Sequence, residues 1–372
     1  MEAEYNSDNS FTYTRYAWGK DRYLAKYLLS RAGKMLYQSA GMSYPAWLRA
    51  ALTACRGRSG EGSISILCCA VRDTALAILL VTSSIAACHA QTAEAGLAAA
   101  RADLDQGRYT DAESVLRDYR AHNPADASGC YLLAYTLFRE NKPADSLKAY
   151  TEAATLRTPG AKDLKTIALD YVLLNDYKDA DHWIRYALSL DGNDPEAWYE
   201  AGRIEYTLNR FQDALESFEQ ALRLNPALVK AENNLGLTLE GLNRTDEALA
   251  AYRKAVAMQN SSEDPSEQPL LNLGTLLVQL NRLDEALPLL LRAHQIAPHD
   301  WKILAQLGRL YGEKGDLDAA RQTLEQAVAI EPKKASLHFQ LGQIYKKSGD
   351  AEKANREFAT VRDLLGTSSS PQ

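Results

Sequence analysis

Hydrophobic residues recur along most of the chain at the three- and four-residue spacing of amphipathic helices, and the whole pattern repeats at intervals of 34 residues, except for one interval of 38 between the units that begin at 229 and 267. The stretch LGLTLEGLNRTDEALAAY, which begins at Leu235, is matched in the same register by LGTLLVQLNRLDEALPLL, which begins at Leu273. A repeat of this length predicts small helical units that bury their apolar faces by stacking on one another. We divide the array into eight units: 93–126, 127–160, 161–194, 195–228, 229–262, 267–300, 301–334 and 335–368.

Three positions in each unit predict its internal structure. Position 8 is always alanine or glycine and position 20 is alanine or serine, and such small side chains let two antiparallel helices cross closely. Position 15 is always glycine or asparagine, the residues that most readily take a left-handed backbone at the end of a helix. These turn residues are Gly107, Asn141, Asn175, Asn209, Asn243, Asn281, Gly315 and Gly349. Each unit is therefore predicted to be a helix, a tight turn and a second helix, with a larger apolar residue at position 24 between the helices.

This arrangement, which ends in proline at position 32 in four units, resembles the tetratricopeptide repeat family. The resemblance covers residues 93–368 and implies an all-α fold, an α-solenoid in which about eight helix-turn-helix units wind into a right-handed superhelix. In this family the first helix of each unit lines a concave groove. No separate helix follows the eighth unit, so the helix through Phe358, Val361 and Leu365 is expected to cap the stack itself.

Position 6 of each first helix is predicted to lie on the face that lines the groove in this family. In the last four units this position holds an amide: Asn234, Asn272, Gln306 and Gln340. An amide both donates and accepts hydrogen bonds, so a row at one-unit spacing is suited to bind the backbone of an extended peptide. The row resembles the asparagine ladder of tetratricopeptide arms that deliver proteins to a sugar transferase. The alternative is that these amides are solvated side chains on an exposed helix face.

Aromatic side chains are predicted on the same face in the N-terminal half of the array. Tyr131, Tyr135 and Tyr199 are candidate anchors for a partner, since tyrosine buries a rigid ring while keeping a polar tip. The alternative is that some of these rings pack between units or against the N-terminal segment. The sequence alone leaves both interpretations open.

Two arginines at position 9 of their units are further candidates for partner binding. Arg203 and Arg309 have the planar fork of donors that binds a carboxylate, or else each pairs with a nearby scaffold acid such as Glu200 or Glu313. The basic residues of the two-carboxylate clamp found in chaperone-binding members of the family are missing around Asn234. Binding to a chaperone tail is therefore not expected.

The distribution of charge restricts the class of partner. The net charge is −6, but residues 1–72 hold ten basic and five acidic residues, and the remainder holds 32 basic and 43 acidic residues. An acidic body argues against a nucleic-acid partner. Of the five cysteines, only Cys130 lies well inside the repeats, and we expect it to be a buried thiol rather than part of a disulfide framework.

The repeats contain no recognisable catalytic or cofactor motif. We find no glycine-rich phosphate loop and no nucleophile elbow. His294 and His299 lie five residues apart, with no cysteine or paired carboxylate near them in the sequence, and this spacing does not predict a metal site. We therefore predict that the chain is not an enzyme and that it holds neither a metal nor a cofactor.

Two segments outside the repeats show no periodic pattern. Residues 1–70 are interpreted as a disordered segment or as translated upstream sequence, in which case Val71 is the working start. Residues 369–372 are expected to form a disordered tail. Neither segment is predicted to contribute to the stack of helices.

Residues 71–92 are interpreted as an export signal. The apolar run at 74–88 is shorter than a membrane span but has the length of a signal-peptide core. Small residues allow cleavage after Ala90, whereas the sequence before Cys88 is typical of bacterial lipoproteins, in which that cysteine is lipidated. A signal-anchor that is retained is the third alternative.

These features together predict an exported, periplasmic or envelope-associated bacterial scaffold, with no catalytic activity, that binds proteins or extended peptides in its groove. The membrane is expected to be contacted only through a lipid anchor or signal-anchor. A role in envelope assembly rests on analogy with the family alone. The alternative is a substrate-recognition or regulatory arm of a separate transferase or peptidase. The sequence does not identify the partner.

Overall fold

The computed structural model describes residues 94–260 and 265–367, and those from Leu97 onward belong to one compact unit. The expectations for residues 1–70, for the signal at 71–92 with Cys88, and for the tail at 369–372 lie outside these described residues. They therefore remain predictions.

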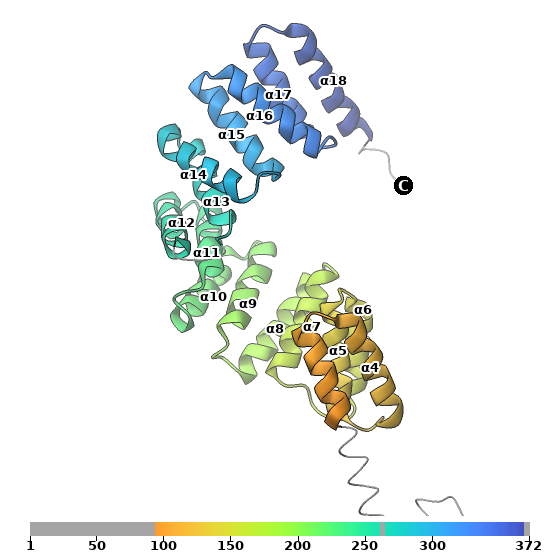
Figure 1. The fold of residues 1–372 in the computed structure, drawn as a ribbon. Helices are drawn as coiled ribbons and strands as arrows, with labels where there is room; N and C mark the ends of the chain where they lie inside the picture. Colours follow the sequence, from red (N-terminus) through yellow and green to blue (C-terminus); the bar gives the residue numbers. More distant parts are fainter. Residues whose placement is uncertain (1–93, 261–264, 368–372) are drawn as a thin grey trace, which may run out of the picture. The chain divides into compact units, whose positions relative to one another are not determined.

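Every regular element in the described residues is an α-helix, and the helices follow one another in antiparallel pairs (Figure 1). A helix at 94–105 precedes α4 (Tyr109–His122), α5 (Ala127–Arg139), α6 (Pro143–Ala154), α7 (Ala161–Leu173), α8 (Tyr177–Leu190), α9 (Pro195–Thr207), α10 (Phe211–Leu224) and α11 (Val229–Gly241). The remaining helices are α12 (Thr245–Gln259), α13 (Gln268–Gln279), α14 (Leu283–Ile296), α15 (Trp301–Lys314), α16 (Leu317–Ile330), α17 (Ala335–Lys347) and α18 (Ala351–Thr367). The predicted all-α architecture of helix-turn-helix units is confirmed.

The turn inside each pair has the backbone that its sequence predicts. All eight residues at position 15 have positive φ, from 58° or 59° at the five asparagines to 86° at Gly349. No other residue in the described part of the chain has a positive φ. Because other side chains are strained in this conformation, the glycine or asparagine fixes where each first helix ends.

The small residue at position 8 packs directly against the large residue at position 24. A Cβ atom added to Gly236 would lie 2.5 Å from the Tyr252 ring, and one added to Gly202 would lie 2.7 Å from the Phe218 ring. These distances are shorter than any ordinary carbon contact, so glycine is what lets the two helices of a pair approach. Tyr252 and Phe218 are fully buried as a result.

Successive pairs are joined by two kinds of helix contact. The second helix of each unit contacts the first helix of the next, as α10 contacts α11 and α16 contacts α17. First helices also contact one another directly, as α5 with α7, α9 with α11, α11 with α13, α13 with α15, and α15 with α17. The outward faces of these first helices therefore form a surface that runs from unit to unit, which we call the first-helix surface.

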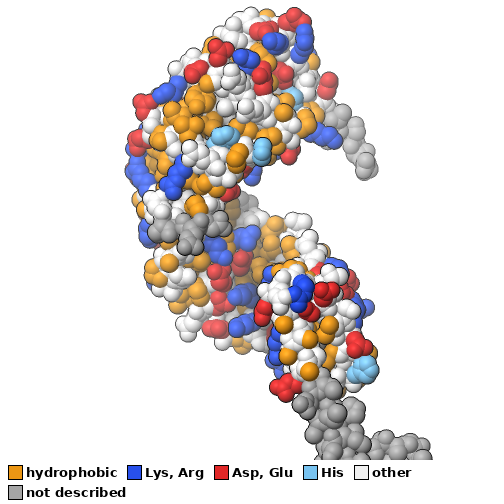
Figure 2. All heavy atoms as spheres, viewed as in Figure 1, with side chains coloured by type: hydrophobic (Ala, Val, Ile, Leu, Met, Phe, Trp, Pro, Cys, Tyr) orange, Lys and Arg blue, Asp and Glu red, His pale blue; other side chains and the backbone are white. Residues whose placement is uncertain are grey.

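No described helix combines the length and the apolar character that crossing a bilayer requires. Acidic and basic side chains are intermingled on the face shown in Figure 2. Among the ion pairs of the described residues, Lys230 pairs with Glu196 of the preceding unit at 2.5 Å, and Lys165 pairs at 2.5 Å with Asp194, the residue before α9. These ion pairs add polar contacts to the apolar packing between units.

Candidate functional site

A chain of amide hydrogen bonds crosses the first-helix surface from α13 to α9. Gln268 Nε2 donates to Asn272 Oδ1 at 3.0 Å, and Asn272 Nδ2 donates to Asn233 Oδ1 at 2.9 Å. Asn233 Nδ2 then donates to Asn234 Oδ1 at 3.2 Å, and Asn234 Nδ2 donates to the hydroxyl of Tyr199 at 3.4 Å. We call these five residues the amide chain.

The amide chain joins three units and fixes the direction of each member. Asn233 is buried and links the two partly exposed asparagines predicted as site residues, Asn234 and Asn272. Each of these amides uses one N–H and its oxygen within the chain, so one N–H and one lone pair are left on each. The sequence predicted Asn234 and Asn272 but not the residues between them, since Asn233 is at position 5 rather than 6.

The two glutamines of the predicted row are arranged differently. Gln306 on α15 and Gln340 on α17 are partly exposed, but the carbonyl oxygen of each is buried and has no hydrogen-bond partner. Within the described residues, no hydrogen bond joins them to Asn272 or to one another. The predicted four-residue row is thus divided into a hydrogen-bonded part in units 5 and 6 and an unbonded part in units 7 and 8.

Two of the predicted anchor tyrosines pack between units. Tyr131 is 5% exposed, and its hydroxyl donates to the carbonyl oxygen of Arg157, whose guanidinium lies 4.4 Å from the ring centre. Tyr199 is 8% exposed, with Lys230 Nζ 4.4 Å from its ring centre. Burial raises the pKa of both hydroxyls. The structure favours the packing alternative for these two rings.

Tyr135 keeps part of its ring at the surface. Its hydroxyl accepts a hydrogen bond of 2.9 Å from Arg139, which also lies 4.7 Å from the ring centre of Tyr109. Phe138 lies beside it, with ring centres 6.3 Å apart. Tyr135 is therefore the predicted tyrosine that is placed to contact a partner without rearrangement of the stack.

Each of the two predicted arginines forms an ion pair with an acidic residue of its own helix, which was the alternative to binding a partner carboxylate. Arg203 lies 2.8 Å from Glu200, and Arg309 lies 3.0 Å from Glu313. Burial raises the pKa of the Glu200 carboxyl, and the positive charges of Arg203 and Lys230 oppose that rise. Because both arginines are exposed, binding of a partner carboxylate would compete with these surface pairs.

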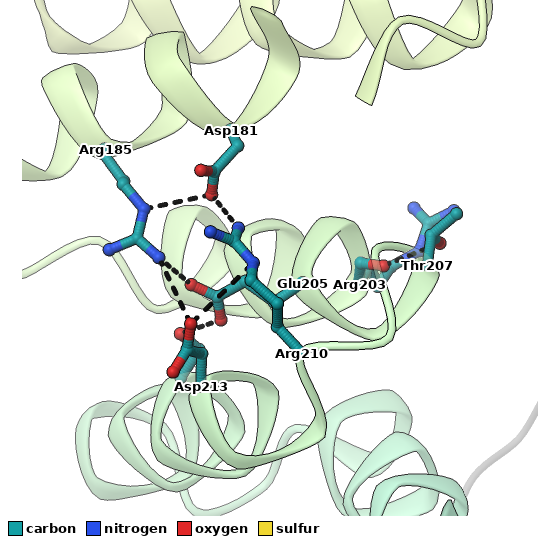
Figure 3. Close-up of polar contacts among 8 residues, drawn as sticks. Asp181, Arg185, Arg203, Glu205, Thr207, Arg210 and Asp213 are labelled. Atoms are coloured by element: carbon teal, nitrogen blue, oxygen red, sulfur yellow. Dashed lines mark hydrogen bonds and ion pairs between the residues drawn. The ribbon is translucent and has the colours of Figure 1, made fainter. Parts of the chain in front are cut away.

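A charge network between units 3 and 4 was not predicted from the sequence (Figure 3). Arg185 on α8 lies 2.8 Å from Glu205 on α9 and 3.0 Å from Asp181, which Arg210 contacts at 2.5 Å. Glu205 is buried and also accepts a hydrogen bond of 2.7 Å from Ser217. Burial raises the pKa of this carboxyl, while its serine and arginine neighbours lower it. The network ties α8, α9 and α10 together.

A second buried acid, Asp170 on α7, has no cation near it in the described structure. Its Oδ2 lies 2.6 Å from Ser146 Oγ, which also lies 2.9 Å from the carbonyl oxygen of Ala134. A hydroxyl has a single proton, so Ser146 either shares it between the two oxygens or donates to Ala134 while a protonated Asp170 donates to Ser146, and only the second arrangement makes both contacts full hydrogen bonds. Burial raises the pKa of Asp170 to about 7. The sequence signal for this contact is the serine at position 20, where the other units have alanine.

The remaining candidate groups are the cysteine thiol and the side chains that could bind a metal ion. Cys130 is a free, buried thiol, as expected. Within residues 94–260 and 265–367, no three histidine, cysteine or acidic side chains gather in a way that would hold a metal ion. The polar side chains that the structure links from unit to unit on the first-helix surface include four amides, which bind by hydrogen bonds.

Models of protein families match most of the repeat array. The model described as tetratricopeptide repeat matches residues 97–161, 166–229, 199–265 and 233–300. A second model, described as TPR repeat, matches residues 308–349. Together these matches cover more than half of the chain.

Curated relatives match short parts of the array. A TPR repeat-containing protein of Methanocaldococcus jannaschii is 35% identical over 85 residues, which are 23% of this chain and 15% of that protein. The peroxisomal targeting signal receptor of Saccharomyces cerevisiae is 35% identical over 79 residues, 21% of this chain and 13% of the receptor. FK506-binding protein 59 of Drosophila melanogaster is 30% identical over 111 residues, 28% of this chain and 25% of that protein. The chain thus spans a quarter or less of these relatives.

Solved structures match larger parts of the chain. PilW, a widely conserved type IV pilus biogenesis factor, is 26% identical, with a TM-score of 0.51, over 56% of this chain and 98% of PilW. A tetratricopeptide repeat protein from Parabacteroides merdae is 17% identical, with a TM-score of 0.54, over 68% of this chain and 99% of that protein. PilF of Pseudomonas aeruginosa is 16% identical, with a TM-score of 0.52, over 61% of this chain and 99% of PilF. The last two similarities establish the fold alone.

Proposed function

Because the chain belongs to the tetratricopeptide repeat family, we propose that it is a scaffold without catalytic activity that holds an extended segment of a protein partner on its first-helix surface. The observation that carries this proposal is the amide chain across α9, α11 and α13. A peptide backbone offers alternating donors and acceptors, and the amide chain leaves one donor and one acceptor on each exposed asparagine.

The amide chain favours binding because its members are held before a partner arrives. Asn272 and Asn234 are each bonded to the buried Asn233, so little side-chain entropy is lost when a ligand binds to them. In a hydrogen-bonded series each bond also polarises the next, which strengthens the outward donors. Backbone recognition of this kind places little demand on the partner's sequence, and Tyr135 and Arg203 are the candidates to add specificity.

The cellular setting belongs to the same proposal. We place the scaffold in the bacterial cell envelope, exported by the signal at 71–92 and either released after Ala90 or anchored by a lipid on Cys88. The similarity to PilW, a type IV pilus biogenesis factor, supports a role in assembling envelope machinery. N-terminal mass analysis of the native protein tests the processing: a start at Gln91 or at a lipidated Cys88 supports it, and a mature protein that contains Trp47 contradicts cleavage at either site.

Quantitative partner capture tests the binding surface. Full-length protein is crosslinked in cells that produce it natively, and each captured protein is quantified for the wild type and for Asn234→Ala/Asn272→Ala. Loss of two ligand hydrogen bonds at about 1 kcal/mol each is expected to lower capture roughly thirty-fold. The control variant, Asn355→Ala/Gln322→Ala, removes two exposed amides from second helices and is expected to leave capture unchanged.

Two outcomes would contradict the proposed role of the amide chain. Unchanged capture with unchanged helicity in circular dichroism would show that partners bind elsewhere. Reduced helicity in the Asn234→Ala/Asn272→Ala variant would show that these amides stabilise the stack instead. If an enzyme subunit is the partner whose capture depends on the two asparagines, the chain is the recognition arm of that enzyme.

A further inference from the structure

The last pair of helices in the described structure, α17 and α18, has an apolar face on the side away from α16. Its members are Phe339 on α17, which is 50% exposed, Leu365 on α18, which is 60% exposed, and the partly exposed Phe358 and Val361. We call these four residues the end face. In Figure 1, α17 and α18 lie at the blue end of the stack, and no labelled helix covers them on that side.

The end face repeats a surface that is buried twice inside the stack. The rings of Phe339 and Phe358 have centres 6.0 Å apart and planes inclined by 53°. In the equivalent pair of unit 4, Tyr199 and Phe218, the ring centres lie 6.0 Å apart and the ring planes are inclined by 51°. In unit 2, the ring centres of Tyr131 and its position-24 partner lie 5.9 Å apart and the planes are inclined by 54°. The same two positions of the repeat thus build the same ring pair three times.

Inside the stack, the segment that follows covers the ring pair and contributes a cation. Arg157 lies over the Tyr131 ring and Lys230 over the Tyr199 ring, each 4.4 Å from the ring centre. These two rings are 5% and 8% exposed, against 50% for Phe339. Among the described residues, Phe339 has no cation over its ring, so it lacks the cover that its equivalents have.

We propose that the end face binds an amphipathic helix of a protein partner, which occupies the place that α11 occupies on α9 and α10 and brings a lysine or arginine over Phe339. The interaction does not depend on the first-helix surface and adds a second binding site to the scaffold. Burial of the two rings supplies apolar area, and the cation interacts with the face of the exposed ring.

The partner helix needs a small residue near Val361. Val361 is at position 27 of its unit, where the other units have alanine, except for Tyr119 in the first unit. There the next helix has Gly129, where an added Cβ would lie 2.6 Å from the Tyr119 ring. A helix on the end face is therefore expected to carry glycine or alanine at its third position, as α11 does at Ala231, together with a cation at its second position, as α11 does at Lys230.

A peptide with the sequence of α11 is the probe that tests this proposal. Residues 228–242 are synthesised with a helix-stabilising crosslink on the outward side and a fluorophore, and anisotropy is measured against the full chain. Saturable binding is expected, with Lys230→Ala in the peptide weakening it two- to five-fold, the range of an exposed cation–π contact. Phe339→Ala in the protein is expected to weaken binding at least ten-fold.

A second variant and a control separate loss of the site from loss of structure. Leu365→Ser changes a side chain that is already 60% exposed, so repeat 8 is expected to stay folded while peptide binding weakens at least three-fold. Leu291→Ala removes another exposed apolar residue, which is on α14 away from the end face and is 38% exposed, and is expected to leave binding unchanged. Asn234→Ala/Asn272→Ala is also expected to bind the probe normally, which distinguishes this site from the first-helix surface.

Three results would overturn the proposal. The first is the absence of saturable binding to the wild-type chain. The second is equal binding by the wild type, Phe339→Ala and Leu365→Ser. The third is a concentration-dependent dimer in sedimentation velocity that disappears in Phe339→Ala, because a second copy of the chain would then be the occupant of the end face.

Discussion

Asp170→Asn is expected to remove a pH dependence from the contact between units 2 and 3. Asp170 is fully buried, its Oδ1 has no hydrogen-bond partner, and its Oδ2 contacts Ser146. Asparagine keeps the size of the side chain and stays neutral, and its amide donates to Ser146 Oγ as a protonated carboxyl would. Ser146 is then free to donate to the carbonyl oxygen of Ala134.

The magnitude follows from the two pKa values of Asp170. Burial raises its pKa from the ordinary 3.8 to about 7 in the folded chain. Between these values the folded chain keeps a proton that the unfolded chain has released, so the free energy of unfolding falls as the pH rises. The difference of about three pH units corresponds to a loss of roughly 4 kcal/mol, complete above pH 7 and absent below pH 4.

Urea unfolding followed by circular dichroism from pH 4.5 to pH 8.5 measures this loss for the wild type and for Asp170→Asn. Subtracting the free energies of unfolding of the two proteins at each pH gives the contribution of Asp170 alone, because the other acidic residues are the same in both. The variant is expected to be about 3 to 4 kcal/mol more stable than the wild type at pH 8 and close to it at pH 4.5. Hydrogen exchange of peptides from α6 and α7 reports whether the change is local to this contact.

A matched substitution at Asp145 tests the reasoning. Asp145→Asn removes a carboxyl that is exposed beside Ser146 and is expected to leave the pH dependence of the wild type in place. Parallel stability curves for the wild type and Asp170→Asn would refute the assignment of a buried, protonated acid. A variant less stable than the wild type at every pH would show that the carboxylate form is the one that holds the two units together.

Two further predictions concern the packing within a unit and the contact between units. Gly236→Ala places a methyl group 2.5 Å from the Tyr252 ring and is expected to lower the free energy of unfolding by about 1 to 3 kcal/mol. Gly366→Ala, where an added Cβ meets nothing within 4 Å, is the control, and equal thermal stability of the two variants would contradict close packing at position 8. Arg185→Ala removes the guanidinium that contacts the buried Glu205, which keeps its hydrogen bond from Ser217 and the charge of Arg210, and is expected to cost about 2 to 3 kcal/mol in urea unfolding. A loss below about 0.5 kcal/mol would instead mark Arg185 as an ordinary surface pair.

The fold of the repeat array was predictable because its main determinants are local. Asparagine or glycine at position 15 marks each turn because few other residues tolerate a backbone with positive φ. Small residues at position 8 and large ones at position 24 belong to the same hairpin, 16 positions apart, so their complementarity recurs in each unit and is visible in the sequence. Tyr119 stands where the internal units have alanine, and the structure shows that Gly129 on the next helix accommodates its ring.

The candidate site was predictable only in part, because it depends on contacts between units. The sequence identified Asn234 and Asn272 as outward amides, but their link through Asn233 joins residues 39 positions apart across two helices. The cover of Tyr131 and Tyr199 likewise comes from beyond their own helices, from Arg157 after α6 and from Lys230 of the following unit, which a pattern within one helix does not contain.

The sequence by itself determined the repeat, the position of every turn and the helical hairpin, since these follow from backbone preference and from side-chain size at neighbouring positions. The tertiary structure decided which polar groups bond across units and which remain outward. It also showed that Phe339, in the same role as two buried tyrosines, is left uncovered. The physical reason is that stacking places each unit's side chains against those of the next, so burial and hydrogen bonding are properties of the neighbour as much as of the residue.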